Sequence, residues 1–120
     1  MLTIHLHDVV FRSKQGVFEE ELVLGNDIIA NVSVSYLPQG EWPITNINAT
    51  LDYTALYQIL NELLATPGAL LETIVGKFAA TTLDKWPQVQ EVHIALKKNH
   101  PAISGWRSGA VGVAFTQKRS

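Results

Sequence analysis

Apolar residues alternate with polar ones near both ends of the chain, whereas in the middle they recur at every third or fourth position. This order constrains the fold more than any other feature of the chain. Apolar residues at every second position predict strands, whereas spacings of three and four predict helices. The strand-like stretches are residues 2–11, 21–37, 92–97 and 111–115, and the helix-like stretches are residues 53–64 and 70–83. The sequence therefore predicts an α+β protein with two strands, two helices and two strands in that order.

Turn-forming residues mark the connections between these stretches. Residues 38–48 contain a glycine and two prolines, which predicts a loop, and Gly25-Asn26 predicts a bulge inside the second strand. Asp52 is a suitable N-cap for the first helix. Thr66-Pro67-Gly68 separates the two helices, and the second helix should end before Trp86-Pro87.

The expected architecture is a four-stranded antiparallel sheet with both helices, inserted between strands two and three, on one face. The other face carries small neutral residues, namely Ser33, Ser35, Ala95, Gly112 and Ala114. Such a face would line a barrel or contact another subunit, and open sheet edges also favour pairing between chains. We therefore expect assembly, with a solvated face as the alternative.

Composition and length exclude several classes of protein. The 120 residues fit a single domain spanning 1–120. A net charge of −2 gives no basic field for nucleic acid, and the absence of cysteine excludes disulfides and thiolate catalysis. No apolar run approaches the roughly 20 residues of a membrane span, and the first residues lack the features of a signal peptide. No membrane partner and a cytoplasmic location are expected.

Two histidines at i and i+2 raise the question of a metal site. His5 and His7 would share one strand face, and His93 and His100 are the only further histidines. Their spacing matches no zinc signature and no cysteine is present to complete one. We therefore expect no metal, and interpret these residues as solvated or packed strand histidines.

Glu72 and Lys98 are the charged residues whose positions are hardest to explain by solvation alone. Glu72 follows two leucines in the first turn of the second helix, where its carboxylate could accept two parallel hydrogen bonds from a guanidine-like edge. The alternative is a favourable interaction with the helix dipole, worth about 0.3–1 kcal/mol. Lys98 ends the third strand in phase with its buried residues, although its amine could also reach solvent.

The order of several short motifs resembles the dihydroneopterin aldolase family over nearly the whole chain. Each motif is common alone, but their order and spacing are specific. They are Gln15-Gly16-Val17 followed by Glu21 and Gly25, then Thr50-Leu51-Asp52-Tyr53, Leu70-Leu71-Glu72, and Lys98 followed by Pro101-Ala102-Ile103 and Gly109-Ala110-Val111-Gly112-Val113. The resemblance implies the tunnelling fold, in which units of this kind assemble side by side into a ring around a tunnel.

The resemblance also implies a reaction, namely metal-free retro-aldol cleavage of dihydroneopterin to hydroxymethyl-dihydropterin and glycolaldehyde in folate biosynthesis. It implies no cofactor, because the pterin ring itself accepts the electrons. Its small-molecule substrate would be bound by Glu72, by the backbone of Leu71 and by Leu51 packed on the ring.

The catalytic residues implied by the resemblance are Lys98, Tyr53 and Glu21. Lys98 would move protons, with Glu21 orienting it and the substrate hydroxyls. Tyr53 would come from the neighbouring subunit, so that a homotetramer or homo-octamer would carry its active sites at subunit interfaces. From the pattern alone, Tyr53 could equally be an aromatic residue at the start of an amphipathic helix.

Two other functions remain open at this point. A dihydroneopterin or dihydroneopterin triphosphate epimerase would share the retro-aldol intermediate with the aldolase. A non-catalytic pterin-binding ring protein would need Glu72 but not the combination of Lys98, Tyr53 and Glu21.

Overall fold

The computed structural model describes residues 1–13, 26–40, 42–45, 50–99, 103–105 and 107–120. Within them, strands and helices follow each other in the predicted order. They are β1 (Leu2–Ser13), β2 (Asn26–Tyr36), α2 (Tyr53–Leu64), α3 (Leu71–Lys85), β3 (Val89–Lys98) and β4 (Val111–Lys118). The part of the second strand expected before Asn26, including Gly25 of the expected bulge, lies outside the described residues.

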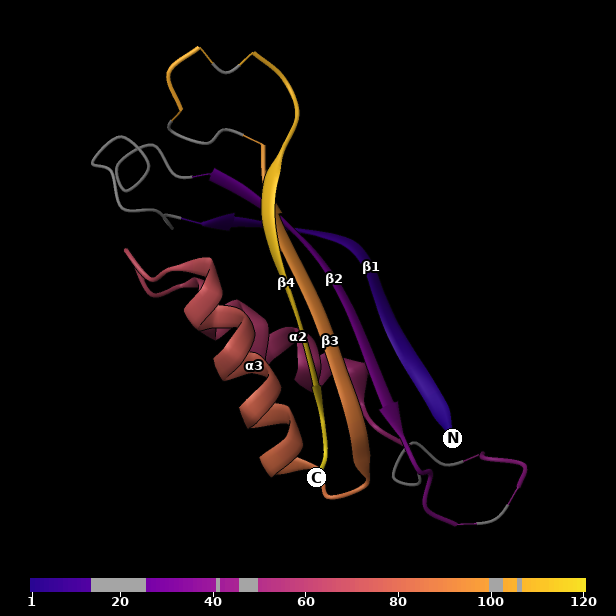
Figure 1. The fold of residues 1–120 in the computed structure, drawn as a ribbon. Helices are drawn as coiled ribbons and strands as arrows, with labels where there is room; N and C mark the ends of the chain where they lie inside the picture. Colours follow the sequence, from indigo (N-terminus) through magenta and orange to yellow (C-terminus); the bar gives the residue numbers. More distant parts are fainter. Residues whose placement is uncertain (14–25, 41, 46–49, 100–102, 106) are drawn as a thin grey trace.

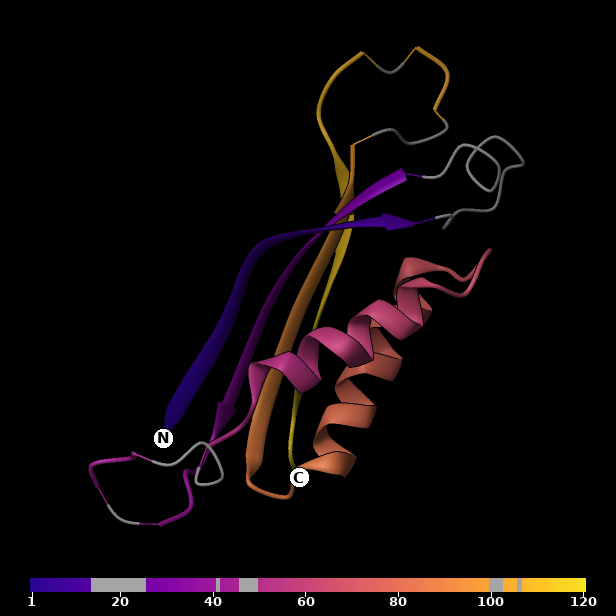
Figure 2. The same ribbon diagram turned by 180° about the vertical axis from the view of Figure 1, so that it is seen from behind.

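The strands form one antiparallel sheet in the order β1-β2-β3-β4. Both helices lie on the same face of this sheet, as predicted (Figures 1 and 2). α3 lies against β3 and β4, whereas α2 contacts α3 and β1. None of the helices in the described part of the chain is long and apolar enough to cross a membrane.

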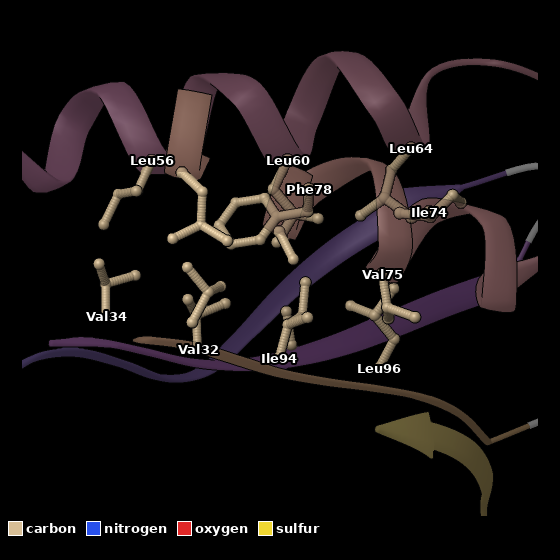
Figure 3. Close-up of a cluster of buried hydrophobic side chains, with 14 of the residues drawn as sticks. Val32, Val34, Leu56, Leu60, Leu64, Ile74, Val75, Phe78, Ile94 and Leu96 are labelled. Atoms are coloured by element: carbon tan, nitrogen blue, oxygen red, sulfur yellow. The ribbon is translucent and has the colours of Figure 1, made fainter. Parts of the chain in front are cut away.

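The core lies between the helices and the sheet face below them (Figure 3). Even-numbered side chains of β2 and β3 point toward apolar side chains of α2 and α3 because strand residues alternate between the two faces. The buried set includes Val32, Val34, Leu56, Leu60, Ile74, Phe78, Ile94 and Leu96. Burying each such side chain stabilises the fold by about 1.5–3 kcal/mol, so this packing fixes the position of α3 on the sheet.

A bulge in β1, absent from the prediction, changes which residues face the helices. Leu6 pairs with Val32 but Val9 pairs with Ala30, so the register shifts between Leu6 and Val9. Asp8 has a positive φ of 51° at this point. Its backbone N–H donates to Asn31 Oδ1 at 3.0 Å, and Asn31 Nδ2 donates to Asp8 Oδ1 at 3.2 Å. The bulge is therefore held by a reciprocal pair of bonds from β2.

The sheet face opposite the helices is covered by short polar and small side chains. The five small residues predicted to share a face do so. Ser33 and Ser35 on β2 lie on the same side as Ala95 of β3, and Gly112 and Ala114 of β4 pair with Lys97 and Ala95 on that side. Hydrogen bonds cross this face between side chains of neighbouring strands. They join Thr3 Oγ1 to Ser35 Oγ at 2.9 Å, His5 Nδ1 to Ser33 Oγ at 2.7 Å, and His93 Nδ1 to Thr116 Oγ1 at 2.7 Å.

Arg119 ties the end of the chain to the end of α3. Its Nη2 donates to the carbonyl oxygens of Leu83 at 2.6 Å and Trp86 at 3.1 Å, and its Nε donates to that of Val89 at 2.7 Å. A guanidinium at a helix C-terminus satisfies carbonyl groups that have no partner within the helix. Arg119 therefore joins the end of α3 to the start of β3.

Candidate active site

A pocket of about 400 Å³ lies where α3 begins, β3 ends and β4 begins. Figure 1 shows these three points at the same end of the sheet. The pocket is lined by Ala69, Leu70, Leu71, Glu72, Lys98, Val111, Gly112 and Val113. Two of the predicted charged residues, Glu72 and Lys98, thus share a pocket with apolar walls.

Glu72 lies in the first turn of α3, as predicted. The helix begins after Gly68, which has a positive φ of 78°, and its N-cap is Leu70, which offers no side-chain hydrogen bond to the first turn. The backbone of Leu71 and the carboxylate of Glu72 therefore lie side by side at an N-terminus without a polar side-chain cap. Unpaired N–H groups and the positive end of the helix dipole favour an acceptor atom of a ligand at this place.

Lys98 reaches the pocket as the last residue of β3. It pairs with Ile28 of β2 and Val111 of β4, and its side chain is half-buried. Its even-numbered position puts it on the helix face with Ile94 and Leu96, as predicted from the sequence. The neighbouring Lys97 lies on the opposite face and is exposed. The pocket therefore receives one amine of this lysine pair.

The wall formed by β4 depends on a glycine. A Cβ on Gly112 would lie 2.5 Å from the carbonyl oxygen of Leu96 and 2.8 Å from the Cβ of Lys97. β4 can approach β3 this closely at Gly112 only because no side chain is present. Val111, Gly112 and Val113 were part of the motif that suggested the family, but their place in the pocket was not predicted.

Tyr53 and Leu51 do not line this pocket. α2 begins at the end of the sheet where β2 ends, whereas α3 begins at the opposite end (Figure 2). Tyr53 is the first residue of α2 and is 62% exposed. Leu51 is only 2% exposed and belongs to the core. Within one chain, the structure therefore brings together Glu72, Leu71 and Lys98 but neither Tyr53 nor Leu51, while Glu21 lies outside the described residues.

Of the histidines singled out in the sequence, His5, His7 and His93 do not line the pocket, and His100 lies outside the described residues. His5 and His7 stack with their ring centroids 5.2 Å apart on β1. In the part of the chain that the structure describes, no three histidine, aspartate or glutamate side chains gather in a way that could hold a metal ion. The pocket at the start of α3 combines two charged groups of opposite sign with a mostly apolar lining.

Comparison with known proteins identifies the family. Residues 4–116 match the FolB family model, described as dihydroneopterin aldolase. The dihydroneopterin aldolase of Bacillus subtilis is 28% identical over 122 aligned positions, which cover 98% of each chain.

Solved structures agree in fold with this chain. Escherichia coli dihydroneopterin aldolase in complex with neopterin superimposes with a TM-score of 0.77 at 15% identity, covering 96% of this chain and 99% of the other. The enzyme from Burkholderia thailendensis bound to guanine superimposes with a TM-score of 0.75 at 17% identity, covering 99% and 92%. The chain belongs to the dihydroneopterin aldolase family.

Proposed function

We propose that this protein is a lyase that cleaves dihydroneopterin into hydroxymethyl-dihydropterin and glycolaldehyde in folate biosynthesis. The observation that carries the proposal is the single pocket that holds the carboxylate of Glu72 and the amine of Lys98 in a chain of this family. A ligand-sized apolar pocket with few convergent polar groups is a usual form of a small-molecule site.

Glu72 anchors the substrate in this proposal. The pterin ring presents a ring N–H and an exocyclic amine side by side, and two carboxylate oxygens match this edge. Guanine and neopterin, the ligands of the two related structures, share the same edge, which supports the choice of Glu72. The backbone of Leu71 binds the ring beside Glu72, and Leu70 and Val113 offer apolar contacts to its flat surface.

Lys98 carries out the proton transfers at the other side of the pocket. A proton leaves the hydroxyl on the second side-chain carbon, the bond between the first and second side-chain carbons breaks, and glycolaldehyde departs. The bonding electrons move into the pterin ring, and a proton added to the first carbon completes hydroxymethyl-dihydropterin. The ring is the electron sink, so this route needs no metal and no cofactor, and the protein positions groups and moves protons.

In this proposal Tyr53 comes from a neighbouring subunit. Tyr53 is exposed at the end of the sheet opposite the pocket. In the described part of the chain, no helix or strand covers the polar face of the sheet or pairs with the outer edges of β1 and β4. These features support a homotetramer or homo-octamer in which Tyr53 and the segment at Leu51 complete the pocket of the next subunit. Glu21 orients the substrate hydroxyls and Lys98, as the family resemblance implies.

The proposed enzyme is a single cytoplasmic domain. Residues 1–120 act as one domain, and the helices and sheet share one core. The net charge of −2 and the lack of a helix suited to cross a membrane in the described part of the chain fit a cytoplasmic enzyme without nucleic-acid or membrane partners.

A turnover assay tests the reaction. Purified protein should release glycolaldehyde from dihydroneopterin, and Lys98→Ala should nearly abolish release while it leaves pterin binding intact. Lys97→Ala is the matched control, because it removes the neighbouring amine on the opposite sheet face. Pterin binding without any release would favour the non-catalytic ring protein, and conversion of the substrate to its epimer as main product would favour the epimerase.

A complementation assay tests the shared site. Glu72→Ala and Tyr53→Phe chains, each inactive or weak alone, should regain activity when co-expressed. About a quarter of the sites in randomly mixed rings would combine an intact pocket with an intact Tyr53. Light scattering should show four or eight chains, and a monomer with full activity would exclude the shared site.

A further inference from the structure

Tyr36 is a buried tyrosine whose hydroxyl is used for one specific contact. It is the last residue of β2 and is only 2% exposed. Its hydroxyl forms a hydrogen bond with the hydroxyl of Thr50, which lies 14 residues further along the chain. A buried tyrosine hydroxyl is costly to leave without a partner, so this contact constrains Thr50.

Thr50 is the first residue of the segment that leads into α2. Leu51 follows and is buried, and Asp52 caps the helix with its Oδ1 accepting from Thr54 N at 2.9 Å. The loop before Thr50 is held at its start, where Leu37 N donates to the carbonyl oxygen of Gln88 at 2.9 Å. The Tyr36–Thr50 bond therefore joins the end of β2 to the entrance of α2.

Tyr53 depends on this entrance for its position. Its side chain is 62% exposed, so packing within the chain contributes little to holding the ring in place. The backbone that carries it is fixed by the Thr50 bond, the burial of Leu51 and the Asp52 cap, all within the three preceding residues. Only Leu51 and Asp52 separate Thr50 from Tyr53, so a displacement of Thr50 would reach Tyr53 through two residues that are themselves held by burial and by the cap.

We propose that Tyr36 and Thr50 are positioning residues that hold Tyr53 and the Leu51 segment in place for the active site of the neighbouring subunit. The inference rests on the proposed role of Tyr53 at a shared site. Tyr36 does not touch the substrate. It acts from the core of one chain, through Thr50, on catalysis in the pocket lined by Glu72 and Lys98 of the next chain.

Single substitutions at both ends of the bond provide the first test. Tyr36→Phe and Thr50→Val remove one hydroxyl each and preserve shape, and each should lower kcat by at least about tenfold, since a misplaced catalytic group is costly. The dissociation constant for neopterin should change much less than kcat, because the Glu72 anchor is untouched and only the Leu51 segment of the binding site is affected. Thr50→Ser keeps a hydroxyl and should restore most of kcat, while the double variant should be no worse than the worse single variant.

Tyr57→Phe is the matched control for the loss of a tyrosine hydroxyl. Tyr57 lies one turn after Tyr53 in α2 and is 41% exposed. Its ring stacks on that of Phe11, with the ring centroids 5.1 Å apart. Its kcat should equal that of the wild type. Circular dichroism and melting temperature, measured on every variant, separate a loss of position from a loss of fold.

Complementation decides whether Tyr36 acts on the neighbouring site. Co-expression with Glu72→Ala should restore the activity of Tyr36→Phe, because the Glu72→Ala chain supplies an intact Tyr53 to the intact pocket of the Tyr36→Phe chain. Co-expression with Tyr53→Phe should not restore activity, because neither chain then supplies a correctly placed and intact Tyr53. Rescue by Tyr53→Phe, or a folded Tyr36→Phe and Thr50→Val with unchanged kcat, would overturn the inference. If Glu72→Ala and Tyr53→Phe fail to complement each other, the shared site is wrong, and the kcat values of the single variants still decide the role of Tyr36.

Discussion

Glu72 and Lys98 line one pocket, although Glu72 belongs to the first turn of α3 and Lys98 is the last residue of β3. They line the same pocket because α3 packs over β3 and starts at the end of the sheet where β3 stops. In the proposed reaction, the carboxylate of Glu72 binds the substrate and the amine of Lys98 transfers protons. Because the two groups belong to different elements, each can be changed without the other.

Removal of the Glu72 carboxylate should abolish tight pterin binding. Hydrogen bonds to charged groups contribute about 1.5–3 kcal/mol each, so Glu72→Ala should weaken neopterin binding by roughly tenfold to more than a hundredfold. Quenching of pterin fluorescence measures the affinity. Glu62→Ala on α2 is the control, since Glu62 is exposed and does not line the pocket. Undiminished affinity of Glu72→Ala would remove Glu72 from the anchoring role.

Loss of the Arg119 side chain should destabilise the fold without changing the pocket. Arg119→Ala leaves the carbonyl oxygens of Leu83, Trp86 and Val89 without these charge-assisted bonds, which should lower the free energy of unfolding by about 1–3 kcal/mol. Urea unfolding at constant protein concentration measures the change. Arg119→Lys should recover only part of it, because an ammonium group lacks the planar fork. Equal stability of Arg119→Ala and wild type would contradict the anchoring role.

A side chain at Gly112 should be poorly tolerated. Gly112→Ala places a Cβ 2.5 Å from the carbonyl oxygen of Leu96, which is backbone and cannot turn away. β4 must shift from β3, so we expect a loss of about 1–3 kcal/mol in the free energy of unfolding. Pterin affinity should fall as well, since Gly112 lines the pocket. A Gly112→Ala variant with the same free energy of unfolding as the wild type, measured in the same urea titration, would contradict this prediction.

Gly76 provides the opposite case. It lies inside α3, and a Cβ added there would meet no atom within 4 Å. Gly76→Ala should therefore raise the free energy of unfolding by roughly 0.5–1 kcal/mol, because alanine favours the helix and restricts the unfolded chain. Calorimetry would detect the higher melting temperature. A lower melting temperature would mean that the open space at Gly76 is needed by the fold or by a contact between chains.

Local patterns in the sequence were sufficient to predict the elements and several of their details. Alternation indicated the strands, and the apolar stripe of α2 together with the acceptor side chain of Asp52 indicated where that helix begins. Glu72 was placed in the first turn of α3 by the same reasoning. These features depend on residues within one or two turns of each other, which is the range over which sequence patterns are informative.

Features that depend on distant residues were not predicted. Gly112 and Val113 enter the pocket because of the register between β3 and β4, and the Tyr36–Thr50 bond closes a loop between elements. The separation of Tyr53 from Glu72 within one chain follows from the direction in which α2 runs over the sheet. The family resemblance, rather than any local pattern, suggested that these residues act together and assigned them to different subunits.

The bulge at Asp8 divides β1 into two halves in which opposite parities of residue number face the helices. Before it, even-numbered residues such as Leu6 face the helices, and after it, odd-numbered residues do, with Phe11 only 4% exposed and Val10 58% exposed. Insertion or deletion of one residue between Leu6 and Val9 would exchange inside for outside in the second half of the strand and leave the first half unchanged. The length of this short stretch is therefore as strictly determined as the identity of any residue in the core.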